Sequence, residues 1–537
     1  MVANLAVVME RRARSQGFWS APAFAVGDRT WTHAEVHRGA AHAAARLGAL
    51  GVAPGDRVLV VAPDGIELVW AFLGTIRLGA VAVLANPRLT VDDHANLAAD
   101  ASPRAMVVAA DIADRFSTAV PTVLTTDALG AHVADSLGHT TSDSVMAPAA
   151  DVGDDDAAYA QYTSGTTGRP KAAVHRHGDP LVYFRAFADT AIGLHRDDVV
   201  YSVSKLFFAY GLGNSLFFPL LSGCRAVLDP GPPRADAAAR LVEDHGVTVV
   251  FSVPTFYARL VAAGERAAFV SLRAAVSAGE ALTPVLAQRA VELLGCPILD
   301  GLGSTEVGQT FVSNTLDACR HGTIGRPLPP YEVAVRDDAG HDLGPDRPGT
   351  LWVRGPTVLL EYLGQPQATA SAVRDGWLCT ADRAMIDADG FVHHLGRVDD
   401  IEVVGGINVA PLEVEAVLVA HPAVSEVAVA GVRDATGASR LEAFVVTVPG
   451  VAPATELIGD ELLAEDLVAR ARTGLAPHKV PRAVHFVDSL PRTPTGKLRR
   501  FLLRTGSWSG DPTAVAVPAA GTEPAAGQQG PGSSPAS

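Results

Sequence analysis

The ten residues Tyr162–Lys171 read YTSGTTGRPK and combine hydroxyl side chains, two glycines and a terminal lysine. The runs on either side, Ala157–Gln161 and Ala172–Val174, lean apolar, so the pattern predicts a strand, a loop and a second strand. Gly165 and Gly168 would let the loop turn tightly and bring its backbone N–H groups close to an anion. The order of residues is not that of a Walker loop, which ends in Gly-Lys-Ser/Thr. We therefore expect a flexible phosphate cradle here.

The cradle would contact phosphate through hydroxyl donors, backbone N–H groups and one cation. The residues in question are Thr163, Ser164, Gly165, Thr166, Thr167, Gly168 and Lys171. The alternative is an ordinary polar turn between two strands.

The composition is that of a folded protein with an ample core, because the 537 residues are 48% hydrophobic and 19% charged. The formal net charge of −15 argues against a nucleic-acid surface, although a nucleotide site needs only local positive groups. No apolar run is long enough to predict a membrane span, and no apolar segment follows the N-terminal arginines as it would in a secretory signal. The cysteines lie far apart without metal-type spacing, which favours a reduced, cytoplasmic setting.

Two changes of pattern divide the chain into three parts. Helical and strand-like segments alternate along most of the chain, which predicts parallel sheets covered by helices and an α/β fold class. A shorter α+β pattern begins near Gly396–Asp400, and the residues after Thr505 are mainly Pro, Ala, Gly, Ser and Gln. We therefore predict a large domain over 1–397, a small domain over 398–505 and a disordered tail over 506–537.

Two further segments carry polar and small residues where a predicted strand ends. Ser277–Glu280 (SAGE) would let a flat base approach the backbone, and Asp300–Glu306 (DGLGSTE) has two glycines that free its backbone. In the second segment, Thr305 could donate to a phosphate, and Glu306 could hold a hard divalent cation that neutralises polyphosphate. Either segment alone is also compatible with a simple turn. The candidate nucleotide contacts are Ala278, Gly279, Glu280, Asp300, Gly301, Leu302, Gly303 and Ser304.

Three single side chains complete the candidate nucleotide site. Asp382 could accept hydrogen bonds from a ribose diol, and Arg397 could bind phosphate or ribose oxygens. Lys497 ends the Gly- and Pro-rich stretch PRTPTGK. Taken singly, each is usually a surface charge, so their interest lies in the motifs that accompany them.

In this order, the motifs resemble those of the adenylate-forming superfamily of acyl-CoA synthetases, luciferases and peptide-synthetase adenylation domains. The similarity covers roughly residues 5–503 and rests on the cradle, the Gly-Ser-Thr-Glu segment, Asp382, the run Gly396–Asp400 and Lys497. It implies a large N-terminal domain of packed sheets and helices, followed by a small, mobile α+β domain.

A narrower resemblance, to the benzoate–CoA ligases, comes from Lys205–Asn214 (KLFFAYGLGN), from DGLGSTE and from Phe311–Asn314 (FVSN). An aromatic and apolar wall suits a flat ring, although these aromatics could also belong to the core. The resemblance, together with the aromatic bulk of Phe208, implies an aryl pocket lined by Phe208, Ala209, Tyr210, Gly303, Gln309 and Thr310.

Three positions depart from common patterns in these families. Gln309 stands where benzoate ligases usually have His, which leaves the ring substitution of the substrate open. Glu402 stands where relatives often carry Lys, and we expect this to alter only a surface contact between domains. Leu302 stands where many superfamily members stack Tyr on adenine, although an aliphatic residue there is familiar in the benzoate branch.

The resemblance implies an ATP-dependent ligase with two half-reactions. In the first, a carboxylate attacks the α-phosphorus of ATP, so that fixed positive groups and Mg²⁺ stabilise the charge that develops. The resemblance assigns Mg²⁺ to Glu306, the α-phosphate to Thr305 and the nucleoside to Asp382 and Arg397. Lys497 would bridge the substrate carboxylate and the α-phosphate.

In the second half-reaction the small domain would rotate about Asp399, the hinge, and admit the thiol of coenzyme A. Gly405 and Gly406 would then face the pantetheine channel, where side chains would block passage. The candidate contacts to the CoA nucleotide are Arg88 and, more weakly, Lys479 and Arg482.

The expected ligands are an aromatic carboxylic acid, ATP and CoA, with neither nucleic acid nor membrane as a partner. A stand-alone enzyme that loads an aryl group onto a carrier protein shares the first half-reaction and is the alternative, and a homodimer is left open. Basic groups such as Arg88 favour free CoA. An inactive relative acting as a binding module is disfavoured because both Lys497 and Glu306 are present.

Overall fold

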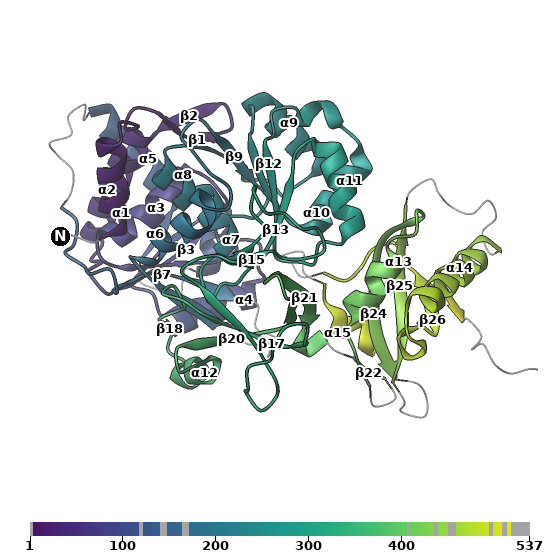
Figure 1. Ribbon diagram of the computed structural model, residues 1–537. Helices are drawn as coiled ribbons and strands as arrows, with labels where there is room; N and C mark the ends of the chain where they lie inside the picture. Colours follow the sequence, from purple (N-terminus) through teal and green to yellow (C-terminus); the bar gives the residue numbers. More distant parts are fainter. Residues whose placement is uncertain are drawn as a thin grey trace, which may run out of the picture. The chain divides into compact units, whose positions relative to one another are not determined.

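The structure, a computed structural model, describes residues 4–116, 122–139, 148–163, 171–400, 402–404, 407–433, 439–448, 458–492, 498–506 and 513–516. The chain divides into two compact units, Met1–Asp399 and Asp400–Ser537. Figure 1 shows the helices and strands of each unit.

A mostly parallel sheet of seven strands forms one half of the larger unit, in the order β18-β8-β7-β4-β3-β5-β6. β3 to β7 pair in parallel, while β8 and β18 add an antiparallel edge. Alternate residues of β3 pack into different apolar clusters, so the strand is buried on both faces and reads as a continuous apolar run. The strands are β3 Arg57–Val61, β4 Val81–Leu84, β5 Ala105–Val108, β6 Val123–Thr125, β7 Ala157–Thr163, β8 Lys171–Arg176 and β18 Glu361–Tyr362.

A second sheet of nine strands has the order β15-β14-β13-β12-β11-β9-β10-β1-β2. Its six central strands pair in parallel, and β2, β14 and β15 are antiparallel at the edges. The strands are β1 Pro22–Val26, β2 Arg29–Thr32, β9 Val199–Ser202, β10 Arg225–Leu228, β11 Val249–Ser252, β12 Ala274–Ser277, β13 Ile298–Gly303, β14 Thr310–Ser313 and β15 Arg326–Pro327.

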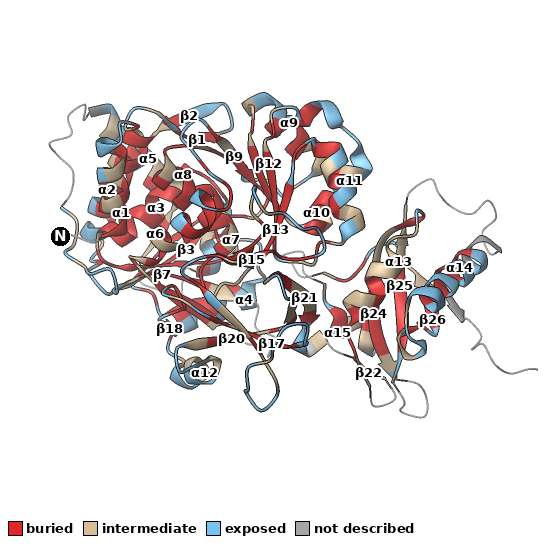
Figure 2. Cartoon of the chain, in the orientation of Figure 1, coloured by how far each residue is buried: buried red, intermediate tan, exposed pale blue. Residues whose placement is uncertain are grey.

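Helices cover these sheets with their apolar faces, and Figure 2 shows buried residues concentrated on the strands and on the inner sides of the helices. α9, α10 and α11 share an apolar cluster with the nine-stranded sheet and lie side by side in Figure 1. The helices of this unit are α1 Leu5–Ser15, α2 His33–Ala49, α3 Ile66–Arg77, α4 Val91–Ala101, α5 Thr126–His139, α6 Asp179–Tyr183, α7 Ala209–Leu212, α8 Phe218–Ser222, α9 Ala235–His245, α10 Pro254–Ala263, α11 Pro284–Leu294 and α12 Pro366–Ala372.

A smaller antiparallel sheet completes the larger unit. Its strands are β16 Glu332–Arg336, β17 Gly349–Arg354, β19 Val373–Arg374, β20 Trp377–Ile386 and β21 Val392–Arg397. β20 pairs with β17, β19 and β21, and so places Asp382 opposite Arg397.

The smaller unit is an α+β structure with its own apolar core. A two-stranded sheet, β22 Glu402–Val404 and β23 Ile407–Val409, precedes a four-stranded sheet in the order β24-β25-β26-β27. The remaining elements are β24 Val424–Arg433, β25 Ser439–Thr447, β26 Ala483–Phe486, β27 Thr513–Ala516, α13 Pro411–Leu418, α14 Ile458–Gly474 and α15 Arg500–Thr505. The α/β class, with a large unit of sheets and helices and a small α+β unit, is confirmed.

The prediction of a disordered tail is wrong for four of its residues. Thr513–Ala516 forms β27 and pairs antiparallel with β26, with Ala483 opposite Ala516. Pairing with β27 covers an edge of β26 that would otherwise present unpaired backbone groups. Residues 507–512 and 517–537 of the tail lie outside the described residues. Among the helices that the structure describes, none is long and apolar enough to cross a membrane.

A buried histidine makes stability depend on pH. The Leu5 backbone N–H donates to His177 Nδ1 at 3.1 Å, so this nitrogen must be unprotonated. Burial lowers the pKa of His177 to about 4, against a weaker opposing effect of Asp156. An unfolded histidine titrates near 6.5, so the unfolded chain binds a proton between about pH 6.5 and 4 that the native protein excludes.

We therefore predict that stability falls as the pH is lowered through this window and that His177→Asn reduces the fall by about 2–4 kcal/mol. Asn cannot titrate and can still accept from Leu5 N–H. Thermal unfolding followed from pH 7 to pH 4.5 measures the effect, with His321→Asn as the matched change at an exposed histidine. An unchanged pH dependence in His177→Asn would contradict the assignment.

Candidate functional site

The described site residues of the large unit include several at the carboxyl ends of parallel strands, the edge at which open α/β sheets bind ligands. Thr163 is the last residue of β7, and Ala278 directly follows β12. Arg88 follows β4, and Leu206 follows β9. The order of strands thus brings segments that are far apart in the sequence to one edge of each sheet.

Some predicted site residues lie outside the described part of the chain. These are Ser164, Gly165, Thr166, Thr167, Gly168, Gly405, Gly406 and Lys497. β7 and β8, the two strands predicted on either side of the cradle, are present and pair as Thr163 with Lys171. Asp399 lies in the 3-10 turn Val398–Asp400 at the boundary between the two units.

The SAGE and DGLGSTE segments are neighbours because β12 and β13 pair in parallel, with Ser277 opposite Asp300. Gly279 has a φ of +89°, a backbone conformation that favours glycine. Glu280 Oε2 accepts hydrogen bonds from the Thr255 N–H, at 3.0 Å, and from the Thr255 hydroxyl. Glu280 therefore fixes the SAGE turn onto the start of α10.

The first half of DGLGSTE is strand, so the alternative of a simple turn does not hold for Asp300–Gly303. β13 continues to Gly303 because β14 pairs with it antiparallel. A Cβ at Gly303 would lie 2.9 Å from the Gln309 carbonyl, so the glycine is needed for the close approach of the two strands. Asp300 is buried, and burial raises its pKa well above the usual range. Leu302 and Ser304 are half-buried.

Thr305 is held through its backbone by a histidine that the sequence reading missed. His175 Nε2 donates to the Thr305 carbonyl at 2.7 Å, and His175 Nδ1 lies 3.1 Å from Asp179 Oδ2. The imidazole ring is thus held on both sides, by a backbone carbonyl and by a carboxylate. The Arg176 N–H also donates to Asp179, at 3.0 Å. The Asp179–His175 pair therefore orients the residue expected to contact the α-phosphate.

Glu306, the candidate metal ligand, is held by a second residue that was missed. The Tyr362 hydroxyl donates to Glu306 Oε1 at 2.9 Å, and the Leu359 N–H donates to the Glu306 carbonyl at 2.7 Å. Lys171 Nζ lies 5.2 Å from the centroid of the same Tyr362 ring, within the range of a cation–π contact. The described end of the cradle and the candidate metal ligand are thus joined through one tyrosine.

Asp382 and Arg397 form a pair at the end of β21. Arg397 Nη1 donates to Asp382 Oδ1 at 3.3 Å, and His394 Nε2 lies 3.3 Å from the same oxygen. Burial alone would raise the pKa of Asp382, but His394, Arg397 and Thr380 outweigh it and the pKa is lowered. Ala381 next to it has a φ of +57°, a strained conformation of the kind that clusters at functional sites. The carboxylate is therefore ionised and fixed.

The segment predicted to form the aryl pocket is anchored on both sides. The Leu206 N–H donates to buried Asp64 at 2.9 Å, and Lys205 Nζ donates to the Asp229 carbonyl at 2.6 Å. Burial raises the pKa of Asp64 to about 7, against the charge of Lys205. Phe208 and Tyr210 are half-buried and pack against the main core. Ala209 is buried.

Both polar atoms of the Gln309 side-chain amide form hydrogen bonds within the protein. Its Nε2 donates to the Tyr210 carbonyl and to Asn214 Oδ1, both at 3.3 Å. Its Oε1 accepts from the Thr310 N–H at 3.0 Å and from the Thr310 hydroxyl at 3.1 Å. A polar contact between Gln309 and a ring substituent, which the sequence left open, would break one of these bonds.

Residues 9–363 match the family model for the AMP-binding enzyme, and residues 413–497 match the AMP-binding enzyme C-terminal domain. The chain belongs to the AMP-binding enzyme family. The resemblance to adenylate-forming enzymes and to benzoate–CoA ligases is therefore confirmed.

Two sequences and one solved structure are similar to this AMP-binding enzyme over most of its length. A p-hydroxybenzoic acid–AMP ligase of Mycobacterium tuberculosis is 43% identical over 507 residues, which cover 94% of this chain and 69% of the relative. A benzoate–CoA ligase of Thauera aromatica is 38% identical over 85% of this chain and 87% of its own length. The crystal structure of a benzoate–CoA ligase from Burkholderia xenovorans LB400 superimposes with a TM-score of 0.85 at 35% identity and covers 93% of this chain and 99% of that one.

The candidate CoA contacts of this AMP-binding enzyme fall in both units. Arg88 is exposed, and its Nη2 donates to the Pro230 carbonyl at 3.3 Å. Lys479 forms an ion pair with Glu413, and Arg482 is exposed in the small unit.

Glu402 is not the surface residue that we expected. It is buried, and its Oε1 accepts from Arg504 Nε at 2.7 Å. A Cβ at Gly431 would lie 2.3 Å from Glu402 Oε2, so the carboxylate is packed against β24. The position therefore belongs to the interior of the small unit.

The described residues hold no cluster of three or more His, Cys, Asp or Glu side chains suited to a metal ion. Mg²⁺ bound with nucleotides is usually held by one or two carboxylates and by phosphate oxygens, so the donor set needed from the protein is small. Glu306, fixed by Tyr362, fits that requirement.

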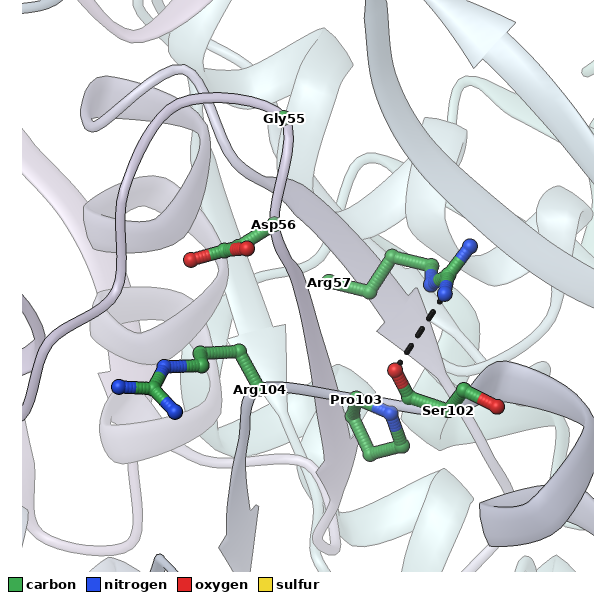
Figure 3. Close-up of a pocket in the computed structure, with 6 residues that line it drawn as sticks. All are labelled: Gly55, Asp56, Arg57, Ser102, Pro103 and Arg104. Carbon is green, nitrogen blue, oxygen red and sulfur yellow. Dashed lines mark hydrogen bonds between the residues drawn. The ribbon is translucent and has the colours of Figure 1, made fainter.

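A cavity of about 410 Å³ lies away from all of these residues. Figure 3 shows it at the amino ends of β3 and β5, with Arg57 Nη2 donating to the Ser102 carbonyl at 3.4 Å. Its lining residues are Gly55, Asp56, Arg57, Ser102, Pro103 and Arg104. Because ligands of parallel sheets bind at the opposite edge, we assign this cavity no part in adenylate formation.

We predict that Tyr362→Phe lowers the rate of adenylate formation by roughly 10- to 100-fold, because a hydrogen bond to a carboxylate is lost. The half-saturating Mg²⁺ concentration should rise as well, since Glu306 is no longer fixed. ATP–pyrophosphate exchange measured against Mg²⁺ concentration tests both. Tyr331→Phe is the matched control, because it removes a hydroxyl that lies 2.9 Å from the Thr357 hydroxyl instead. Equal losses in the two variants would show that Tyr362 has no special role.

Proposed function

We propose that this enzyme activates benzoate or a substituted benzoate with ATP and then forms its CoA thioester. The observation that carries the proposal is the junction of Tyr210 with the DGLGSTE strand: Gln309 donates to the Tyr210 carbonyl, and Gln309 packs against Gly303. An aromatic wall therefore adjoins the residues expected to bind ATP. Curated benzoate–CoA ligases that align along most of their length support the same chemistry.

In the first half-reaction the acid's carboxylate oxygen bonds to the α-phosphorus of ATP, and the bond to pyrophosphate breaks. Lys497 would hold the carboxylate and an α-phosphoryl oxygen together, while Thr305 donates to the α-phosphate. Asp382 and Arg397 would bind the nucleoside. Mg²⁺, where bound at Glu306, would neutralise charge on the phosphoryl oxygens.

In the second half-reaction a thiol sulfur bonds to the acyl carbon, and AMP leaves with the bonding electrons of the acyl–oxygen bond while the thiol proton passes to solvent. We propose that residues 398–505 rotate about Asp399 to withdraw Lys497 before this step. Gly405 and Gly406 would then face the pantetheine arm, and Arg88, Lys479 and Arg482 would supply positive charge for the CoA phosphates.

A second candidate is an enzyme that delivers the aryl group to a carrier protein. The p-hydroxybenzoic acid–AMP ligase with 43% identity favours this candidate, because its name gives the adenylate as the product and includes no CoA step. This chain covers 69% of that relative. The two candidates share the adenylate and differ in the thiol that accepts the acyl group.

One experiment tests the function and its alternative in sequence. Pyrophosphate release is measured with benzoate, hydroxybenzoates and octanoate, and the preferred acid is then assayed for thioester formation with CoA and with a phosphopantetheinylated carrier protein. We expect a benzoate to be preferred and CoA to be acylated. A preference for octanoate would refute the aryl assignment, and acylation of the carrier alone would replace CoA by the second candidate.

Lys497→Ala should reduce adenylate formation by about 10²-fold or more while thioester formation from supplied acyl-adenylate persists. The reason is that the lysine is needed only while the α-phosphoryl group is attacked. Arg499→Ala is the matched control, because Arg499 is an exposed cation two residues later, 5.0 Å from the Phe501 ring centroid. Equal loss of both half-reactions in Lys497→Ala would refute this role.

A further inference from the structure

Asp64 is a buried carboxyl group that joins the two large sheets. It follows β3 of the seven-stranded sheet, and only 4% of its surface is exposed. Its Oδ1 accepts the Leu206 N–H at 2.9 Å, and Leu206 follows β9 of the nine-stranded sheet, 142 residues further along the chain. An amide or a hydroxyl would accept the same hydrogen bond without burying an ionisable group, so the choice of a carboxyl needs an explanation.

The titratable groups that face Asp64 come from the loops after three strands and from β9. Lys205 lies in the loop after β9, Asp229 directly follows β10, and Arg88 follows β4. Lys205 is itself buried, and its Nζ donates to the Asp229 carbonyl at 2.6 Å and lies 3.7 Å from Asp229 Oδ2. Burial, and then the charges of Asp229 and Asp64, raise the pKa of Tyr201 on β9, so its hydroxyl stays neutral. Asp64 therefore faces two cations and one other carboxylate.

The Asp64 carboxyl changes its charge near neutral pH. Burial raises its pKa to about 7, with a smaller contribution from Asp229, while Lys205, the Leu206 N–H and Arg88 act in the opposite direction. Perturbed carboxyls of this kind cluster at functional sites. An ionised carboxylate accepts a stronger hydrogen bond than a neutral carboxyl does. The bond to Leu206 is therefore stronger above about pH 7 than below it.

This bond lies at the start of the segment predicted to contact the ring of the acid. The Phe208 N–H donates to the Lys205 carbonyl at 2.9 Å, and α7 begins with Ala209 directly afterwards. A Cβ at Gly211 would lie 2.1 Å from the same carbonyl oxygen, so α7 packs closely against this turn. A shift of Leu206 would therefore move α7 and the predicted ring contacts that it carries.

We propose that Asp64 is a positioning residue for the aromatic acid, because its carboxylate holds Leu206 from the opposite sheet and so sets the place of the ring contacts on α7. The inference rests on the proposed aryl-acid function. Asp64 acts through the backbone of Leu206 and not by touching the acid. A purely structural link would serve equally well at every pH, whereas a link made by the charged carboxylate weakens acid binding when the carboxyl takes up a proton.

The KM for the preferred benzoate in ATP–pyrophosphate exchange tests this role, measured from about pH 6 to about pH 8.5 at saturating Mg²⁺ and ATP. Wild type is compared with Asp64→Asn, which keeps an acceptor for the Leu206 N–H and cannot ionise. We expect the two KM values to agree at the lowest pH, where wild-type Asp64 is protonated. At the highest pH the KM of the variant should be roughly 3- to 10-fold above that of the wild type, with smaller changes in kcat and in the KM for ATP.

Asp229→Asn is the matched control, because it also removes a carboxylate from Lys205 but leaves the Leu206 bond in place. Its KM for the acid at the highest pH should remain that of the wild type. An equal rise in both variants would overturn the inference alone, and so would a ratio between Asp64→Asn and wild type that is the same at every pH. If no benzoate supports exchange, the proposed function fails and the inference fails with it.

If Asp64→Asn does not fold, the wild type alone decides. Binding of a non-reactive benzoyl-adenylate analogue is measured by calorimetry near neutral pH in buffers of different ionisation enthalpy, and again at the two ends of the pH range. A ligand that binds better to the ionised carboxyl lowers its pKa, so protons are released to the buffer and the affinity is higher at the upper end. Equal affinities without proton release would overturn the proposal.

Discussion

The hydrogen bond from His175 Nε2 to the Thr305 carbonyl joins the two large sheets at the point where the chemistry is expected. His175 lies on β8 of the seven-stranded sheet, and Thr305 follows β13 of the nine-stranded sheet. The Tyr362 hydroxyl and the Leu359 N–H hold Glu306 from the same side. Without these three bonds, the segment between β13 and β14 would be an unsupported turn. Its shape therefore depends on the docking of the two sheets and not on its own sequence.

This dependence explains what could be predicted from the sequence and what could not. The strands on either side of the cradle, the α+β unit and the neighbourhood of SAGE and DGLGSTE follow from local apolar runs and from the rule that parallel strands bind ligands at their carboxyl ends. His175 lies 130 residues from Thr305, and Tyr362 lies 56 residues from Glu306. Neither carries a local signal of its role, because His175 is one polar residue of the mainly apolar β8 and Tyr362 is one of the two residues of β18.

The same limit applies where pairing decides local structure. Asp300–Gly303 contains two glycines and reads as a turn, yet it is strand because β14 pairs with it. Thr513–Ala516 lies in a stretch of low-complexity composition, yet it pairs with the edge of β26. Glu402 was expected at the surface, yet its carboxylate is buried and accepts a hydrogen bond from Arg504. In each case a partner that is remote in the sequence overrides the local pattern.

In the small unit, buried charges link Asp400 and α13 to α15. Arg500 Nη1 bonds Glu415 Oε1 and the Val429 carbonyl, each at 2.5 Å, and Arg500 Nε lies 3.6 Å from Asp400 Oδ1. Burial alone would lower the pKa of Arg500, but the surrounding carboxylates outweigh it and raise the pKa. Such a network contributes little net stability compared with apolar packing, but losing one partner is costly. Its value lies in fixing one geometry for α15.

The residues expected to contact the ligands are positioned by hydrogen bonds within the large unit. His175, itself paired with Asp179, holds Thr305, and Tyr362 holds Glu306. Gln309 uses both polar atoms of its amide in the same way, on Tyr210, Asn214 and Thr310. A polar group that is fixed before its ligand binds needs no reorganisation when charge develops next to it. The segment expected to contact phosphate and the segment expected to contact the ring are therefore preorganised by the same means, hydrogen bonds that the protein completes by itself.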